Sequence, residues 1–207
     1  MSYTQGLAIF SGGVSGSLAL LWKRELKVDV WGLSHWYIDA LIDYDNSDEV
    51  LRFARFYGHP KTNKRKETWT LLESLKHNNQ ITWLCIGDFN EITSSSEKVG
   101  GNIRQARQMD RFCRVIHHCA FQDLGFVGPP FTWSKNNGNE EQIRYRLDRA
   151  LASIEWQAKF QGATLHHIAM STFDHSLLPL QFPHIRLQPQ GGVKLFRFEA
   201  VAPRSTV

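Results

Sequence analysis

Two polar side chains follow a short apolar segment in the middle of the chain. The stretch Trp83-Leu-Cys-Ile-Gly-Asp-Phe-Asn90 is typical of a strand that ends at Gly87, with Asp88 and Asn90 after it. Because side chains alternate along a strand with a period of two, we expect both to lie on one face. A carboxylate beside an amide suits a phosphate site, where the amide donates to a phosphate oxygen and the carboxylate holds a metal ion or a water. Gly, Asp and Asn also form turns, so an ordinary turn is the alternative.

Two other groups carry similar chemistry. Asp174 and His175 are adjacent and precede an apolar segment. Such a pair can bind a metal or polarise a phosphoryl oxygen, and a capped turn with a solvated His is the alternative. Strand alternation would place Arg144, Arg146 and Asp148 together on one face, where the alternative is a salt-bridged face of a sheet.

A phenol and a run of bases lie earlier in the chain. Tyr57 ends a predicted strand, so its hydroxyl either donates to a phosphate or its ring packs half-buried. Residues 52–66 hold six bases and no acid: Arg52, Arg55, Lys61, Lys64, Arg65 and Lys66. This run is either a phosphate-facing edge or a solvated surface. Over the whole chain, 24 Lys and Arg against 20 Asp and Glu give a net charge of +4, which mildly favours polyanionic partners.

Strands and helices must bring these residues together. Alternating patterns and turn residues predict strands at 17–22, 27–33, 36–43, 51–57, 81–86, 142–151, 164–170 and 177–182. Apolar residues three and four apart predict helices at 64–76 and 105–118, with a helical turn at 155–160. Many short strands with two or three amphipathic helices favour an α+β domain of packed sheet and helix layers.

Composition excludes several classes of protein. A chain of 207 residues, 42% hydrophobic and 21% charged, is that of one core-forming domain, not of a disordered, collagenous or coiled-coil protein. The apolar run at 18–22 stops at Lys23, far short of a membrane span. The first residues resemble no targeting peptide, so we expect an intracellular protein, in nucleus or cytoplasm. Its three cysteines contain no CxxC pair and are expected to be reduced thiols.

The order and spacing of the motifs resemble the endonuclease/exonuclease/phosphatase superfamily, and specifically the endonuclease domain of plant LINE-type (non-LTR) retrotransposons. The matching segments cover nearly the whole chain: Gly16-Ser-Leu-Ala-Leu-Leu-Trp-Lys23, Phe56-Tyr-Gly-His-Pro60, Gly87-Asp-Phe-Asn-Glu-Ile92, Phe131-Thr-Trp-Ser134, Arg146-Leu-Asp-Arg-Ala-Leu151 and Asp174-His175. The most specific of them is Gly87-Asp-Phe-Asn-Glu-Ile92. Phe196-Arg-Phe-Glu199 looks like the segment that follows the domain in these elements.

This resemblance implies a fold and an activity. The fold is a four-layered α/β sandwich, with two mixed sheets packed face to face, helices outside them and the active site at one end. The activity is Mg²⁺-dependent hydrolysis of phosphodiester bonds in DNA.

The resemblance also implies roles for single residues. Asp88 would orient and deprotonate the attacking water, Asn90 would hold a phosphate oxygen, and Tyr57 would contact the scissile phosphate. His175 would stabilise the developing pentacovalent charge, and Asp148 would orient that imidazole. The expected Mg²⁺ ligands are Asp174 and Asp88.

The sequence departs from the family pattern in two places. The family begins with a strand carrying a Trp-Asn motif and a later strand carrying a Gln-Glu motif, whose Glu is the principal metal ligand. Neither motif precedes the first matching segment here, so we expect a domain that lacks its first strands and binds Mg²⁺ weakly. Phe173 stands where the family usually has Ser.

We therefore predict a DNA-nicking endonuclease-like domain of retroelement origin at residues 1–185, impaired by the missing motifs, with a linker or tail at 186–207. We expect a monomer that binds DNA and no membrane. The alternative is a non-catalytic nucleic-acid-binding remnant, and a third possibility is a phosphatase acting on a small phosphoester or phospholipid. The predicted phosphate contacts are Arg52, Arg55, Lys61, Arg144 and Arg146.

Overall fold

A six-stranded sheet organises the protein. The structure is a computed structural model that describes residues 5–10, 17–44, 50–76, 82–135, 142–171 and 174–182. The strand order is β3-β4-β5-β6-β11-β8, and only the β5–β6 pair is parallel. The strands are β3 (Lys27–Ser34), β4 (Tyr37–Asp43), β5 (Leu51–Tyr57), β6 (Trp83–Asp88), β11 (Asp148–Ser153) and β8 (Phe121–Asp123).

Three small sheets make up a second β layer. One pairs β1 with β2, another has the order β7-β10-β9, and the third pairs β12 with β13. Their strands are β1 (Gln5–Ile9), β2 (Leu18–Trp22), β7 (Lys98–Val99), β9 (Trp133–Lys135), β10 (Ile143–Tyr145), β12 (Thr164–Leu165) and β13 (Leu180–Gln181). Apolar side chains of β2, β12 and β13 pack with those of the main sheet in one buried cluster. The two β layers therefore share a core, as in a sandwich.

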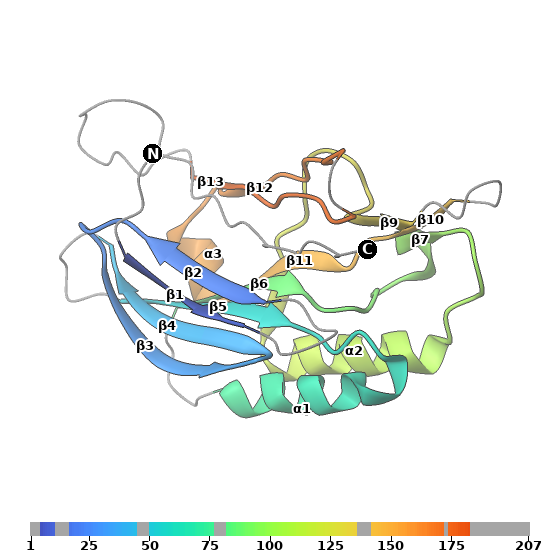
Figure 1. Cartoon of the computed structure of the whole chain (residues 1–207), viewed down its shortest axis with the longest axis horizontal. Helices are drawn as coiled ribbons and strands as arrows, with labels where there is room; N and C mark the ends of the chain where they lie inside the picture. The colour runs from blue at the N-terminus through green and yellow to red at the C-terminus, as the bar shows by residue number, and fades with distance from the viewer. Residues whose placement is uncertain are drawn as a thin grey trace.

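Two long helices cover the opposite face of the main sheet. They are α1 (Arg65–Leu75) and α2 (Ala106–His118), preceded by the short 3₁₀ turns Thr62–Lys64 and Ser95–Glu97. In Figure 1 they lie side by side beneath the sheet. Trp69, Phe112 and Val115 bury their side chains against Phe56 and neighbouring sheet residues in a second cluster. The shorter α3 (Ile154–Lys159) belongs to the first core through Trp156. The expected α/β sandwich is confirmed.

The sequence patterns located most elements correctly. The helices expected at 64–76 and 105–118 are α1 and α2, and the strand expected at 51–57 is β5. The prediction of one continuous strand at 142–151 is wrong, because the chain passes from one sheet to another within this segment. It leaves β10 at Arg146, whose N–H donates to the carbonyl of Glu97, and enters the main sheet at Asp148.

Some expectations fall outside the described residues. The proposed tail at 186–207, the position of Phe173 and the segment around Gly16 all lie there, and the domain boundary stays a prediction. None of the described helices is both long and apolar enough to cross a membrane.

Candidate active site

Three neighbouring strands bring polar side chains to one end of the sheet. The parallel pairing of β5 with β6 places Tyr57 opposite Asp88, and the antiparallel pairing of β11 with β6 places Asp148 opposite Asp88. Directly opposed residues project from the same face of a sheet. Ile86 and Ala150, two residues away on β6 and β11, lie in the core between the β layers, so the polar groups stand at the rim of that core.

His175 connects the two carboxylates. Its Nδ1 lies 2.8 Å from Asp148 Oδ2, and its Nε2 lies 3.9 Å from Asp88 Oδ2. A backbone bridge to Trp133 and the hydrogen bond from the Ser176 N–H to the Thr132 carbonyl fix this segment against β9. The structure therefore brings together the Asp88, Asp148 and His175 that the sequence analysis selected.

Asn90 lies beside Asp88, as the spacing predicted, but it is not part of the strand. The strand ends at Asp88, and Asn90 adopts a left-handed backbone conformation with φ of 56°. Its backbone N–H donates to Asp88 Oδ1, and its Nδ2 donates to Asp88 Oδ2 and to the Gly58 carbonyl. These bonds use both amide hydrogens of the side chain. As placed, Asn90 orients Asp88 and has no donor left for a phosphate oxygen.

The site holds an unusual set of charges. Burial and the nearby charge of Asp148 raise the pKa of Asp88 to about 6. Burial alone would lower the pKa of His175, but the charge and hydrogen bond of Asp148, together with the charge of Asp88, raise it to about 10. At neutral pH His175 is therefore an imidazolium that lies between the carboxylates of Asp88 and Asp148.

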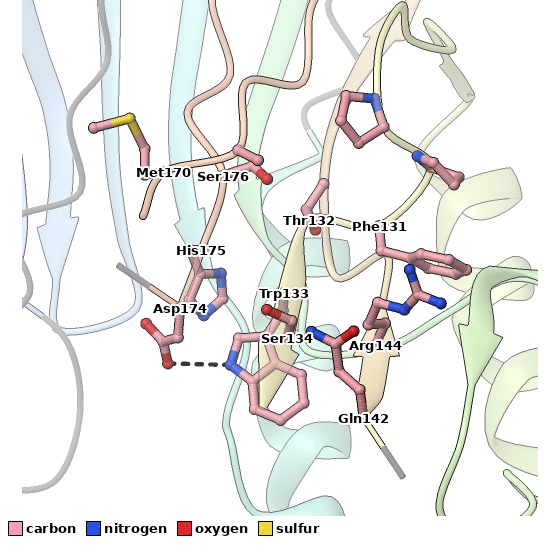
Figure 2. A pocket seen from close by; sticks show the side chains of 13 residues that line it. Phe131, Thr132, Trp133, Ser134, Gln142, Arg144, Met170, Asp174, His175 and Ser176 are labelled. Carbon is pink, nitrogen blue, oxygen red and sulfur yellow. Dashed lines mark hydrogen bonds between the residues drawn. The ribbon is translucent and has the colours of Figure 1, made fainter. Parts of the chain in front are cut away.

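A pocket of about 220 Å³ opens beside His175. Figure 2 shows Asp174 turned toward the indole of Trp133, whose Nε1 donates to Asp174 Oδ2 over 3.1 Å. Arg144 lies over the Phe131 ring at 5.1 Å. The Nε of Arg144 is buried and has no hydrogen-bond partner within the described part of the chain. The pocket thus combines aromatic walls with a guanidinium group, a combination suited to an anion attached to an apolar ring.

The predicted Mg²⁺ ligands do not meet in this structure. Among the described residues, no three His, Cys, Asp or Glu side chains form a group that could hold a metal ion. Asp174 accepts from Trp133, and Asp88 accepts from Asn90 while facing the imidazolium of His175. A metal ion at Asp88 would have to displace these contacts. As placed, these residues do not fit a Mg²⁺ site.

The five predicted phosphate contacts separate into two groups. Arg52 is 2% exposed and paired with Asp39, and Arg146 is 7% exposed and paired with Glu97 and Asp123. Neither guanidinium is available to a phosphate, so the prediction is corrected for these two. The reason is that both guanidinium groups already neutralise carboxylates within the protein. Arg55 is half-buried and donates to the Ile86 carbonyl, Lys61 is exposed, and Arg144 lines the pocket.

Sequence reasoning missed the residue that supports Asp148. Thr132 is buried, and its Oγ1 accepts hydrogen bonds from the backbone N–H groups of Leu147 and Asp148. Thr132 belongs to the Phe131-Thr-Trp-Ser134 motif, which carried the resemblance without a role. The signal that the sequence offered for this role was Thr132 itself, a short hydroxyl side chain between Phe131 and Trp133.

Comparison with known proteins defines the fold. No protein-family model matches the chain, and no curated protein is similar to it in sequence. The solved endonuclease domain of TRAS1, a telomere-specific non-LTR retrotransposon, superposes with a TM-score of 0.62 at 12% identity, covering 87% of this chain and 81% of that one. A functionally unknown conserved protein from Enterococcus faecalis gives a TM-score of 0.55 at 14% identity, covering 85% and 74%.

An AP endonuclease has the same architecture. AP endonuclease LMAP from Leishmania major gives a TM-score of 0.50 at 12% identity, over 69% of this chain and 53% of the enzyme. This chain therefore matches about half of the Leishmania protein. The fold is therefore the α/β sandwich that this chain shares with the TRAS1 endonuclease domain and the Leishmania AP endonuclease.

Proposed function

We propose that the protein is an endonuclease-like domain of retroelement origin that binds DNA and hydrolyses its phosphodiester bonds slowly. The observation that carries the proposal is the Asp88–His175–Asp148 group at the sheet end, next to a pocket that contains Arg144. The TRAS1 endonuclease domain and the plant LINE-type motifs of the sequence support the retroelement origin.

Each side chain of the group has a distinct task. Asp88, fixed by Asn90, accepts a proton from the attacking water. The water oxygen forms a bond to phosphorus, the bond to the leaving oxygen breaks, and that oxygen takes a proton from solvent. His175 donates through Nε2 to a non-bridging oxygen whose negative charge grows in the transition state. Asp148 holds Nδ1, which keeps the imidazole protonated and correctly turned.

The same geometry explains why hydrolysis should be slow. Phosphoryl transfer depends mainly on positioning and on neutralising charge. The residues of this site supply that charge through one imidazolium and the guanidinium of Arg144, and their arrangement does not fit a Mg²⁺ ion. The predicted stimulation by Mg²⁺ is therefore expected to be small, and any binding at Asp88 must displace the contact of this carboxylate with His175.

Nicking of supercoiled plasmid tests the proposal. The purified chain is assayed with Mg²⁺ and with EDTA, alongside Asp88→Asn, His175→Ala and the exposed control Asp110→Asn. We expect slow nicking by the wild type and the control, and a loss of at least 100-fold in both site variants, the usual scale for removing a general base or a charge-stabilising donor.

Two outcomes would contradict it. Equal nicking by the site variants would assign the activity to a contaminating nuclease. No nicking by folded wild-type protein that still binds DNA in EDTA would select the alternative, a nucleic-acid-binding domain without catalysis, which the poor fit of Mg²⁺ also favours.

A further inference from the structure

Three aromatic rings gather beside the Asp88–His175–Asp148 group. Trp36 lies in the turn between β3 and β4, and Tyr57 and His59 lie at the end of β5. The Trp36 and Tyr57 rings are nearly parallel, with an interplanar angle of 7° and centroids 6.1 Å apart. The Trp36 and His59 centroids are 4.9 Å apart with an angle of 31°. All three side chains are half-buried, so each keeps part of its surface in solvent.

Backbone hydrogen bonds hold this aromatic stack in place. The Tyr57 N–H donates to the Trp36 carbonyl over 2.7 Å, and the His59 N–H donates to Thr68 Oγ1 over 3.1 Å. The rings are therefore tied to the sheet and to α1. A preformed stack loses little conformational entropy when a further ring joins it.

His59 is held as a neutral ring. The Lys61 N–H donates to His59 Nδ1 over 3.0 Å, so the hydrogen of the neutral imidazole is on Nε2. Burial and the charge of Lys64 lower its pKa. A neutral ring with an outward N–H can both stack on a base and donate to it.

Exposed cations flank the stack. Lys61, Lys64 and Lys66 are all exposed. Of the other three bases of the run, Arg52 and Arg65 are buried in ion pairs with Asp39 and Glu91, and Arg55 is half-buried and donates to the Ile86 carbonyl. Planar rings next to flexible ammonium groups are the combination that binds single-stranded nucleic acid, where bases stack on aromatics and cations follow the phosphates.

We infer that Trp36 and His59 form a stacking platform for an unpaired nucleobase next to the scissile phosphodiester. Tyr57 links the platform to the active site, because its strand pairs with β6 at Asp88. A base can lie on this platform only when it is free of its complementary strand. The substrate class is therefore DNA with single-stranded nucleotides at the cleavage position, such as a gap, a flap or a melted segment. The inference rests on the proposed function in one respect only, namely that the phosphodiester next to the bound base is the one that is cleaved.

Binding in EDTA tests the platform separately from hydrolysis. Fluorescence anisotropy measures the affinity for a labelled 12-nucleotide single strand and for the matching duplex, using wild type, Trp36→Ala, Trp36→Phe and His59→Ala. Trp31→Ala is the matched control, since Trp31 is a 44% exposed tryptophan on β3. We expect Trp36→Ala to weaken single-strand binding by about 5- to 150-fold and Trp36→Phe to restore most of it, because one stacked base contributes about 1–3 kcal/mol. Duplex affinity should change less than twofold.

Salt dependence separates stacking from charge. Trp36→Ala should leave the slope of log K against log salt unchanged, whereas Lys61→Gln should reduce it by about 0.7, the value for one phosphate contact on a single strand. Circular dichroism establishes whether Trp36→Ala folds, and if it does not, His59→Ala and Trp36→Phe decide the result.

The outcomes distinguish this inference from the proposed function. Single-strand affinity unaffected at Trp36 and His59, or weakened equally by Trp31→Ala, overturns the platform even if plasmid nicking is observed. A selective loss at Trp36 and His59 with no nicking by the wild type supports the platform and overturns the hydrolase.

Discussion

At the scale of single residues, the site is defined by one histidine between two carboxylates. Asp148 makes the close contact with His175, and Asp88 stays 3.9 Å away. A water can therefore donate to Asp88 and accept from the His175 Nε2–H at once, with its oxygen at about 2.8 Å from each. Under the proposed function this gap is the place of the attacking water, because a direct Asp88–His175 bond would leave neither group for it.

This arrangement predicts the pH dependence of nicking. Asp88 must be ionised to accept a proton, so the rate should rise as pH increases through about 6, the raised pKa of this residue. His175 must be protonated, so the rate should fall as pH passes about 10. Initial rates between pH 4.5 and 10.5 measure both limbs, whose midpoints belong to the coupled pair.

Asp148→Asn is the control for the upper limb. Without the Asp148 charge the pKa of His175 should fall, and the descending limb should move to lower pH. An unchanged upper limb in this variant would show that another group is responsible for it.

At the scale of elements, a buried ionic network holds the site strands in position. Glu97 Oε2 lies 2.9 Å from an Arg149 nitrogen and Oε1 lies 2.8 Å from one of Arg146, while Asp123 pairs with both arginines. Arg149 is fully buried on β11, one residue after Asp148. The network therefore connects the 3₁₀ turn at Ser95–Glu97 and β8 to the strand that carries Asp148.

Removing the charge of Glu97 should destabilise the protein strongly. Glu97→Gln leaves Arg149 buried with one carboxylate fewer, and breaking such a pair typically costs about 3–5 kcal/mol. Urea unfolding at pH 7 measures the loss. Glu25→Gln, in an exposed turn, is the control and should change stability by less than about 0.5 kcal/mol.

The pKa of Glu97 predicts how the stability of the protein changes in acid. Burial would raise the pKa of Glu97, but Arg149 outweighs it and lowers the pKa to about 2 from the usual 4.5. The stability that Glu97 contributes is therefore fully present above pH 4.5 and is lost as pH falls toward 2. Glu97→Gln should flatten this part of the profile, and an identical acid transition in both proteins would contradict the assignment.

Sequence patterns predicted the helices and strands better than they predicted the contacts between side chains. The helices were found because their apolar residues face one core, a property of a single segment. The failure at 142–151 has a different origin: Arg144, Arg146 and Asp148 alternate as a strand would, yet one lines the pocket, one joins the ionic network and one enters the active site. Only partners distant in sequence, Glu97 and Asp123 among them, decide this division. Motif resemblance supplied Asp88, Asp148 and His175, whereas Thr132 depended on backbone geometry.

At the scale of the whole molecule, one close backbone approach joins the halves of the main sheet. The β3-β4-β5 meander meets the β6-β11-β8 group at the β5–β6 pair. A Cβ added to Gly87 on β6 would lie 1.8 Å from the Phe56 carbonyl oxygen on β5. The distance between these strands, and with it the alignment of Tyr57 and Asp88, therefore depends on a residue without a side chain.

Gly87→Ala should weaken the whole fold as well as the site. The two strands must separate to admit a methyl group, and overpacking of this kind costs typically 1–3 kcal/mol or more. Gly125→Ala is the matched control: its φ is +68° but nothing lies within 4 Å of the added Cβ, so only conformational strain of about 1–2 kcal/mol is expected. Urea unfolding and plasmid nicking should show loss of both stability and activity at Gly87. Equal stability losses in the two variants would contradict a role for the close approach.

The parallel β5–β6 pair also has a consequence for the order of folding. A parallel pair needs a long crossover, here containing α1, and its strands cannot meet until that crossover has formed. Asp148 and His175 come from still later segments, so the contacts that join them to Asp88 close large loops of chain. Contacts of this kind form slowly and late. Early folding intermediates should contain helices and the β3–β4 hairpin while the Asp88–Asp148–His175 group is still unassembled, and a nascent chain would complete this group only late in folding.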